Sequence, residues 1–237
     1  MITERIGVIG LGNAGGAVAG ALAKKTKVVG FDPSPERCMN AKGLGVDCVD
    51  SVEELAEKTD HIILSLPKPE ISIAVTKSLC DGASTPKLLI ETSTVTPQTA
   101  VTCDNLCKQK QIAYVDAAIA GGVASMAAGE ITFFLGGAVE NKKLAHGILS
   151  LIAAGIYDLG PVGAGMGTKV VNNGVMHALM VVLIEAFSMS NKLGVSSQTM
   201  IEILNREEGL LRPLVHRVQE RMQEGNYEGG MSVTNAR

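Results

Sequence analysis

The chain has 237 residues, of which 46% are hydrophobic and 19% are charged, so it is large enough for one large or two ordinary globular domains. Its net charge of -3 argues against general nucleic-acid binding, which needs a basic surface. Tryptophan is absent and aromatic residues make up only 3% of the chain, which also disfavours a platform for stacking bases.

The N-terminus and the cysteines bear on the compartment. The segment Met1–Arg5 is polar and the apolar run behind it is broken by glycines at once, so no secretory signal peptide is predicted. Five cysteines, an odd number, without such a signal indicate reduced thiols in the cytoplasm. Cys103 and Cys107 have helical i,i+4 spacing and could hold a metal ion, but no second ligand pair accompanies them. Buried thiols and no metal site are therefore expected.

Strand and helix signals alternate through the first two thirds of the chain. Short apolar runs predict strands at 5–9, 27–31, 46–48, 61–66, 87–91, 113–116, 132–135 and 156–157. Helices are predicted between them, at 17–23, 52–58, 71–80, 98–108 and 142–153. This alternation with short connections predicts an α/β fold in which a mostly parallel sheet carries helices on both faces.

Three glycines follow the first predicted strand with the spacing G-x-G-x-x-G. Gly10, Gly12 and Gly15 lie between a strand and a helix, and Asp32 ends the next strand about twenty residues on, the context of a dinucleotide-binding turn. Asp32 would accept hydrogen bonds from the adenosine ribose and repel a 2′-phosphate, which favours NAD over NADP. Arg37 is the opposing observation, because an arginine could hold that phosphate. A tight turn without a ligand is the remaining alternative.

A long helix is predicted to follow the glycines at 163, 165 and 167 and to reach Asn191, with Gly194 as its C-terminal stop. Its residues are apolar nearly all round, so the helix should be buried. A membrane span is less favoured than a soluble core helix, because the run contains amides, a histidine and a glutamate.

The same helix carries polar side chains near its entrance. Lys169 and Asn173 are four residues apart and project from one face. A buried lysine beside an amide is a candidate site, since burying such groups without partners is costly. The alternative is a lysine that extends its amine to water beside satisfied amides, and the helix by itself leaves both open.

Four segments together resemble the β-hydroxyacid dehydrogenase family, whose members include 3-hydroxyisobutyrate dehydrogenase. They are the loop 9–15, then Leu66-Pro67 with 91–97, then 116–122 with its continuation to 137, and finally the glycines of 163–167 with Lys169, Asn172 and Asn173. Their order and spacing match the family over nearly the whole chain. The combination is far more specific than any one motif.

The resemblance implies roles for individual residues. Lys169 resembles the catalytic lysine, Asn173 the amide that orients the substrate, and Gly121 and Gly122 the loop that binds the substrate carboxylate. Ala120 stands where the family usually has a serine in that loop, so one substrate hydrogen bond is expected to be missing. The expected cofactor-binding residues are Gly10, Leu11, Gly12, Asn13, Ala14, Gly15, Asp32, Leu66, Pro67 and Thr94.

The resemblance also implies a domain plan. A Rossmann-type NAD-binding domain is expected at 1–160 and an all-α substrate and dimerisation domain at 161–237. Family members continue beyond the position of Arg237, so the helical domain is expected to be truncated or completed by a partner chain. We therefore expect a homodimer.

The function that the resemblance implies is NAD(P)-dependent interconversion of a small 3-hydroxy acid with its semialdehyde or keto form, in the cytoplasm, with NAD preferred. The partners expected are a small carboxylic-acid substrate and a second copy of the chain, and neither nucleic acid nor a membrane. Two alternatives remain open: an imine reductase-like enzyme, which Lys169 beside Asn173 disfavours, and a catalytically weak dinucleotide-binding protein, which Ala120 favours.

Overall fold

The computed structural model describes residues 5–206 and the single positions 218, 223 and 225. The chain forms two compact units, Met1–Asn173 and Gly174–Arg237, which are described one at a time. The division falls inside one long helix, so Lys169 and Asn173 belong to the first unit. The domain boundary expected at residue 160 stays a prediction.

The first unit is built on one eight-stranded sheet with the order β3-β2-β1-β4-β5-β6-β7-β8. All neighbouring strands are parallel except β6 and β7, which are antiparallel. The first six strands follow the doubly wound order 3-2-1-4-5-6 of dinucleotide-binding folds, which confirms the predicted fold class. The strands are β1 (Ile6–Ile9), β2 (Val28–Phe31), β3 (Asp47–Cys48), β4 (His61–Leu64), β5 (Leu88–Glu91), β6 (Ala113–Ala120), β7 (Ile131–Gly137) and β8 (Ala153–Asp158).

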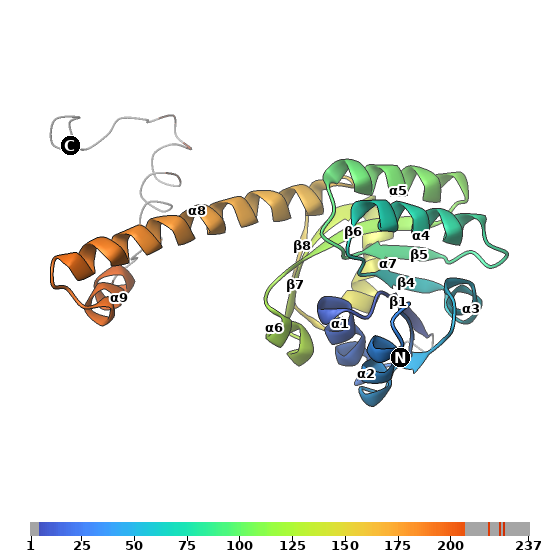
Figure 1. Cartoon of the computed structure of the whole chain (residues 1–237). Helices are drawn as coiled ribbons and strands as arrows, with labels where there is room; N and C mark the ends of the chain where they lie inside the picture. Colours follow the sequence, from blue (N-terminus) through green and yellow to red (C-terminus); the bar gives the residue numbers. More distant parts are fainter. Residues whose placement is uncertain (1–4, 207–217, 219–222, 224, 226–237) are drawn as a thin grey trace. The chain divides into compact units, whose positions relative to one another are not determined.

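Helices cover both faces of this sheet (Figure 1). They are α1 (Asn13–Ala23), α2 (Pro35–Gly43), α3 (Val52–Lys58), α4 (Pro69–Asp81), α5 (Pro97–Gln109), α6 (Val123–Ala128) and α7 (Val139–Leu149). Buried side chains of α1, α2, α6 and α7 pack on one face, and those of α3, α4 and α5 pack on the other. Burial on both faces explains why β1, β4 and β5 are apolar without alternation.

Local sequence signals explain where most of these helices begin. Proline occupies the first turn of α2, α4 and α5, where its missing N–H has no intrahelical partner to lose. Side-chain oxygens of Ser34, Ser51 and Thr96 cap α2, α3 and α5. The short helix α6 was not predicted, because its six residues carry little periodic signal.

The long helix is α8 (Ala164–Lys192), and it is followed by α9 (Ser197–Asn205). The expectation that α8 is buried on every side is wrong for most of its length, because the described part of the chain supplies few elements to cover it. Exposed apolar residues of α8 are Val170, Val171, Val175, Met176, Met180, Val181, Val182, Ile184 and Met189. The sequence also predicts that the segment 210–222 could cover another face of this helix, and that segment lies outside the described residues except at position 218.

Among the described residues, α8 is the one helix long and apolar enough to cross a membrane: it has 29 residues, and an 18-residue stretch of it has a mean hydropathy of 1.6. Length and composition of this kind also occur in core helices of soluble proteins. By these two properties alone, α8 fits either environment.

Candidate active site

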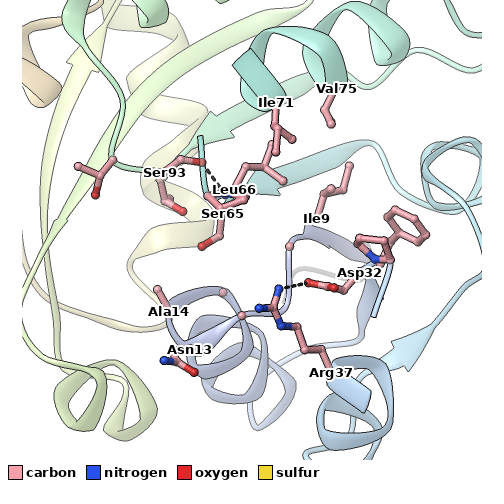
Figure 2. Close-up of a pocket in the computed structure, with 18 residues that line it drawn as sticks. Ile9, Asn13, Ala14, Asp32, Arg37, Ser65, Leu66, Ile71, Val75 and Ser93 are labelled. Carbon is pink, nitrogen blue, oxygen red and sulfur yellow. Dashed lines mark hydrogen bonds and ion pairs between the residues drawn. The ribbon is translucent and has the colours of Figure 1, made fainter. Parts of the chain in front are cut away.

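A cavity of about 550 Å³ opens at the carboxyl ends of β1, β2, β4 and β5 (Figure 2). This is where doubly wound sheets bind their ligands, and the volume falls in the usual range of small-molecule sites. Nine of the ten predicted cofactor-binding residues line it. The nine are Gly10, Gly12, Asn13, Ala14, Gly15, Asp32, Leu66, Pro67 and Thr94.

The tenth residue, Leu11, does not line the cavity. Its side chain is 4% exposed and packs in the core under α1, and its part in cofactor binding stays a prediction. Its backbone N–H instead donates to Oδ2 of Asp32 at 2.8 Å. Leu11 therefore helps to hold the loop and the acid together, which an apolar side chain in a motif does not reveal.

The glycines of the loop are needed for its shape. Gly10 has φ +91°, and a Cβ there would lie 2.2 Å from the carbonyl oxygen of Ser65 on the neighbouring strand's extension. A Cβ at Gly15 would lie 1.9 Å from the carbonyl oxygen of Gly10, so helix α1 can approach its strand only with glycine there. At Gly12 the nearest atom would be 3.8 Å away, which leaves room for a ligand against the backbone.

The start of α1 fits a pyrophosphate. Its N-cap is Gly12, which offers no side-chain acceptor, and no acidic residue lies in the first turn. Asn13, Ala14 and Gly15 of this turn line the cavity. The free N–H groups and the positive end of the helix dipole therefore favour an anion in the cavity.

Asp32 is 6% exposed and is held by several donors. Its Oδ1 accepts from the N–H of Ser34 at 2.9 Å, and its Oδ2 accepts from Leu11 N–H and, at 3.4 Å, from Nη1 of Arg37. Figure 2 shows Arg37 reaching across to this carboxylate at the edge of the cavity. The acid and its opposing arginine thus form one pair, in which three of the carboxylate's roughly four acceptor positions are used.

The opposite wall was not predicted in full. Ser93 Oγ accepts from the N–H of Leu66 at 2.7 Å, which ties the loop after β5 to the loop after β4. Figure 2 shows this bond beside Ile71 and Val75 of α4. The sequence signal that could have identified the lining residues of this wall is their position at the carboxyl ends of neighbouring parallel strands. The lining residues that were not predicted as cofactor-binding are Ile9, Phe31, Pro33, Arg37, Ser65, Ile71, Val75, Thr92 and Ser93.

A buried carboxylic acid lies directly below this wall. Glu91 is fully buried, and its Oε1 accepts from the N–H of Ser93 at 2.9 Å. Its Oε2 has no hydrogen-bond partner within the described part of the chain. Burial raises the pKa of Glu91 from 4.5 to about 7, against the opposing effect of the bonds from Ser93. The loop after β5, in which Ser93 accepts from Leu66, is therefore hydrogen-bonded to a carboxyl group that titrates near neutral pH.

Lys169 lies in the second turn of α8 and is half-buried. Burial lowers the pKa of its amine below 10.5, because the charged form loses solvation. The amine makes no hydrogen bond or ion pair with any residue that the structure describes. Asn173 is also half-buried one turn further on. Neither residue lines the 550 Å³ cavity.

The predicted substrate loop follows β6. Ala120 is the last residue of this strand, Gly121 has φ +138°, and Gly122 is the N-cap of α6. Both glycines are exposed, and a Cβ at Gly122 would meet no atom within 4 Å. Their backbone is therefore open to a ligand, although these three residues do not line the cavity. Within the described residues no group of three His, Cys, Asp or Glu side chains could hold a metal ion.

The doubly wound sheet, the glycine loop and the anion-binding helix start define a dinucleotide-binding protein. Known sequences agree with this class: the sequence model described as "NAD binding domain of 6-phosphogluconate dehydrogenase" matches residues 5–160. The model described as "NAD-binding of NADP-dependent 3-hydroxyisobutyrate dehydrogenase" matches residues 163–236. The chain belongs to the β-hydroxyacid dehydrogenase family, and it is an NAD(P)-dependent oxidoreductase.

Individual relatives support this assignment. The chain is 31% identical over 205 residues to a probable 3-hydroxyisobutyrate dehydrogenase of Mycobacterium tuberculosis, covering 86% of this chain and 70% of that protein. A solved structure of M. tuberculosis 3-hydroxyisobutyrate dehydrogenase superposes with a TM-score of 0.80 and 30% identity, over 88% of this chain and 72% of that one. An imine reductase of Myxococcus stipitatus has a TM-score of 0.81 at 19% identity, over 94% of this chain and 78% of that one, and shows the shared fold alone.

Proposed function

We propose that the chain interconverts a small 3-hydroxy acid with its semialdehyde or keto form, with Lys169 as the acid–base residue. The observation that carries the proposal is a lysine with a lowered pKa in the same compact unit as the dinucleotide cavity. The names of the M. tuberculosis relatives support the substrate class. The M. tuberculosis structure was solved with L-serine, which is itself a 3-hydroxy acid.

In oxidation, the neutral amine of Lys169 takes the proton of the substrate hydroxyl. The bound nicotinamide dinucleotide supplies the hydride acceptor. In reduction, the ammonium form of Lys169 gives a proton to the developing alkoxide. Burial brings the amine towards the neutral form that oxidation requires, and acid–base help of this kind accelerates reactions by about 10²–10⁴-fold.

The substrate carboxylate is proposed to bind at the loop after β6. Gly121 and Gly122 are exposed and offer backbone N–H groups without side chains in the way. Asn173, one helical turn from Lys169, orients the substrate. Ala120 provides no hydroxyl, so the substrate loses one hydrogen bond, which is worth about 1 kcal/mol.

NAD is the proposed preferred cofactor, with NADP also accepted. The buried, hydrogen-bonded carboxylate of Asp32 at the edge of the cavity favours ribose hydroxyls over a 2′-phosphate. Arg37 is 54% exposed at its side chain and supports residual binding of NADP. The description of the second matching sequence model, which names NADP dependence, is the observation against a strict preference.

A symmetric homodimer that covers the apolar side chains of α8 is proposed as the working assembly. Val175, Val182 and Ile184 of the second unit are 60–62% exposed. Apolar surface of this kind marks an interface, and two-fold pairs are the commonest oligomers. Burial between two protein copies, rather than in a membrane, accommodates the polar His177 and Glu185 of the same helix.

A reducing compartment, the cytoplasm, is proposed from the cysteines. All five are unpaired, and Cys103 and Cys107 are buried in the core under α5. Neither nucleic acid nor a membrane is a proposed partner, because the net charge is -3 and the polar residues of α8 disfavour lipid.

Steady-state turnover tests the proposal against its alternatives. L-serine, other 3-hydroxy acids and their semialdehydes are assayed with NAD and with NADP, beside a set of cyclic imines. The proposal requires turnover of a 3-hydroxy acid that is lost in Lys169→Ala. Turnover of imines alone would indicate an imine reductase, and dinucleotide binding without any turnover would indicate a binding protein, the alternative that Ala120 favours.

A further inference from the structure

A buried carboxylate on β6 caps the start of α8. Oδ1 of Asp116 accepts from the N–H of Gly163 at 2.8 Å, and Oδ2 accepts from the N–H of Met166 at 2.9 Å. These are donors that a helix start leaves without intrahelical partners. Asp116, which is fully buried, thus satisfies them from a distant part of the sequence.

The backbone of α8 approaches the sheet as closely as it can at this point. A Cβ at Gly165 would lie 2.2 Å from the carbonyl oxygen of Phe134 on β7 and 2.9 Å from Oδ2 of Asp116. A Cβ at Gly136 would lie 2.5 Å from Oδ1 of Asp116 and 2.9 Å from the backbone nitrogen of Gly165. Glycine on both sides lets the helix start lie directly on β6 and β7. The first turn of α8 therefore lies in close contact with both strands.

The position of Lys169 depends on this first turn. Lys169 follows Met166 by three residues, about one helical turn. Its amine has no hydrogen bond or ion pair with the described residues, so none of these residues holds the amine in place through a polar bond. The side chain of Lys169 extends from the helical backbone that follows the turn capped by Asp116. The position of that backbone also sets how far the amine is buried, and this burial lowers its pKa.

We infer that Asp116 is a positioning residue for the reaction: by capping the first turn of α8 on β6, it fixes where the amine of Lys169 lies and how far that amine is shielded from water. The inference rests on the acid–base role proposed above for Lys169. Asp116 itself does not exchange a proton with the substrate, because its oxygens are occupied by backbone N–H groups.

The charge of Asp116 contributes to the cap. A carboxylate at a helix N-terminus is stabilised by the helix dipole and by N–H donors. Burial raises the pKa of the Asp116 carboxyl, and the bonds from Gly163 and Met166 oppose that rise. The substitution Asp116→Asn keeps the size of the side chain. It leaves only one acceptor oxygen, however, for the N–H groups of Gly163 and Met166, which in the parent each have an oxygen of their own. The first turn should then loosen while the fold is kept.

The test compares purified full-length parent and Asp116→Asn in the oxidation of the best hydroxy acid from the turnover panel. Displacement of a catalytic group by about 1 Å can cost about 10²-fold in rate, so a fall of kcat by about 10–100-fold is expected. The equilibrium dissociation constant of NAD should change less than about threefold, because the glycine loop is untouched. The acid limb of the pH–rate profile should move to higher pH, because a less shielded amine deprotonates at higher pH.

Asp104→Asn is the matched control. Asp104 is also a buried acid, 4% exposed, but it lies on α5 and pairs with Lys108. This variant should keep the parental kcat and the parental pH limb. Gly165→Ala is the second test variant: the added methyl group displaces the helix start without removing the carboxylate, and it should move the limb in the same direction as Asp116→Asn. It decides the question if Asp116→Asn does not fold.

Lys169→Ala separates failure of this inference from failure of the proposed function. If Lys169→Ala keeps its activity, the proposed function fails, and the inference fails with it. If Lys169→Ala is inactive but the folded test variant keeps the parental pH limb, Asp116 only stabilises the fold and the inference is overturned. A loss of kcat without any shift of the limb has the same meaning.

Discussion

The two ends of α8 differ in surroundings. The first ten residues, 164–173, belong to the compact unit of the sheet, where Asp116 caps the helix and Lys169 is half-buried. The remainder belongs to the second unit, where Val182 is 60% exposed and Met189 is also 60% exposed. One helix thus shows that an apolar sequence does not determine burial. What packs around each turn decides both the exposure of apolar side chains and the pKa of polar ones.

The largest effect is expected from comparing the two lysines of this helix. Lys169→Ala should lower kcat by about 10²–10⁴-fold, the range of acid–base catalysis, while the NAD dissociation constant stays nearly unchanged. Lys192→Ala, at the exposed C-terminal end, is the matched control and should leave kcat unchanged. Steady-state kinetics and a cofactor-binding titration measure both. Residual activity of Lys169→Ala within tenfold of the parent would rule out its acid–base role.

The role of the exposed end of α8 in self-association is tested by introducing a charged residue. Val182→Glu should weaken self-association by about 10²-fold, because burying an unpaired charge in an interface costs several kcal/mol. Sedimentation velocity of parent and variant over a range of micromolar concentrations measures the change. Glu202→Gln, an exposed residue of α9, is the control and should associate like the parent. A soluble parent that is monomeric throughout this range contradicts the proposed homodimer.

The buried Glu91 of the sheet unit also predicts that stability depends on pH. The pKa of Glu91 in the folded chain is about 7, above its ordinary 4.5, so between these values the native state binds more protons than the unfolded state. The free energy of unfolding should therefore fall as pH rises through this window, by roughly 3 kcal/mol for this group. Glu91→Gln should remove this part of the slope.

Urea unfolding of parent and Glu91→Gln at pH 4.5 and pH 8 measures the difference in slope, which cancels the other titrating groups. Glu57→Gln, an exposed residue of α3, serves as control and should follow the parent. Equal slopes for parent and Glu91→Gln would show that Glu91 is not held in its neutral form at pH 4.5–7.

The smallest effect is expected at the cofactor's ribose. Asp32→Ala should weaken NAD by about tenfold, equivalent to about 1.4 kcal/mol, with less effect on NADP, so the preference narrows. Arg37→Ala should weaken NADP while leaving NAD nearly unchanged, since Arg37 is the cation beside the cavity edge. Titrations of both cofactors measure these changes. Tighter binding of NADP than NAD by the parent would show that Arg37 governs the ribose pocket.

Much of the first unit could be predicted because its signals are local. The helix 52–58 has the predicted bounds. Ser51 caps its start, acidic side chains lie in its first turn and a lysine lies in its last turn, as the helix dipole favours. The glycine loop with Asp32 was also predictable, because Gly10 and Gly15 exclude side chains for steric reasons written in the motif itself. The reversed direction of β7 and the presence of Ser93 in the cavity were not predictable from such signals, because both depend on which strands become neighbours.

The sequence by itself determined the α/β class and the dinucleotide loop, because turn glycines, strand runs and motif spacing act over short stretches of chain. The residues proposed for catalysis came from its resemblance to the family. Only the tertiary structure decided that Asp116 caps a helix 47 residues away, that Glu91 is buried with a raised pKa, and that most of α8 is exposed. Hydrogen bonds between distant residues and the solvation of a side chain depend on what packs beside it. No local pattern contains that information.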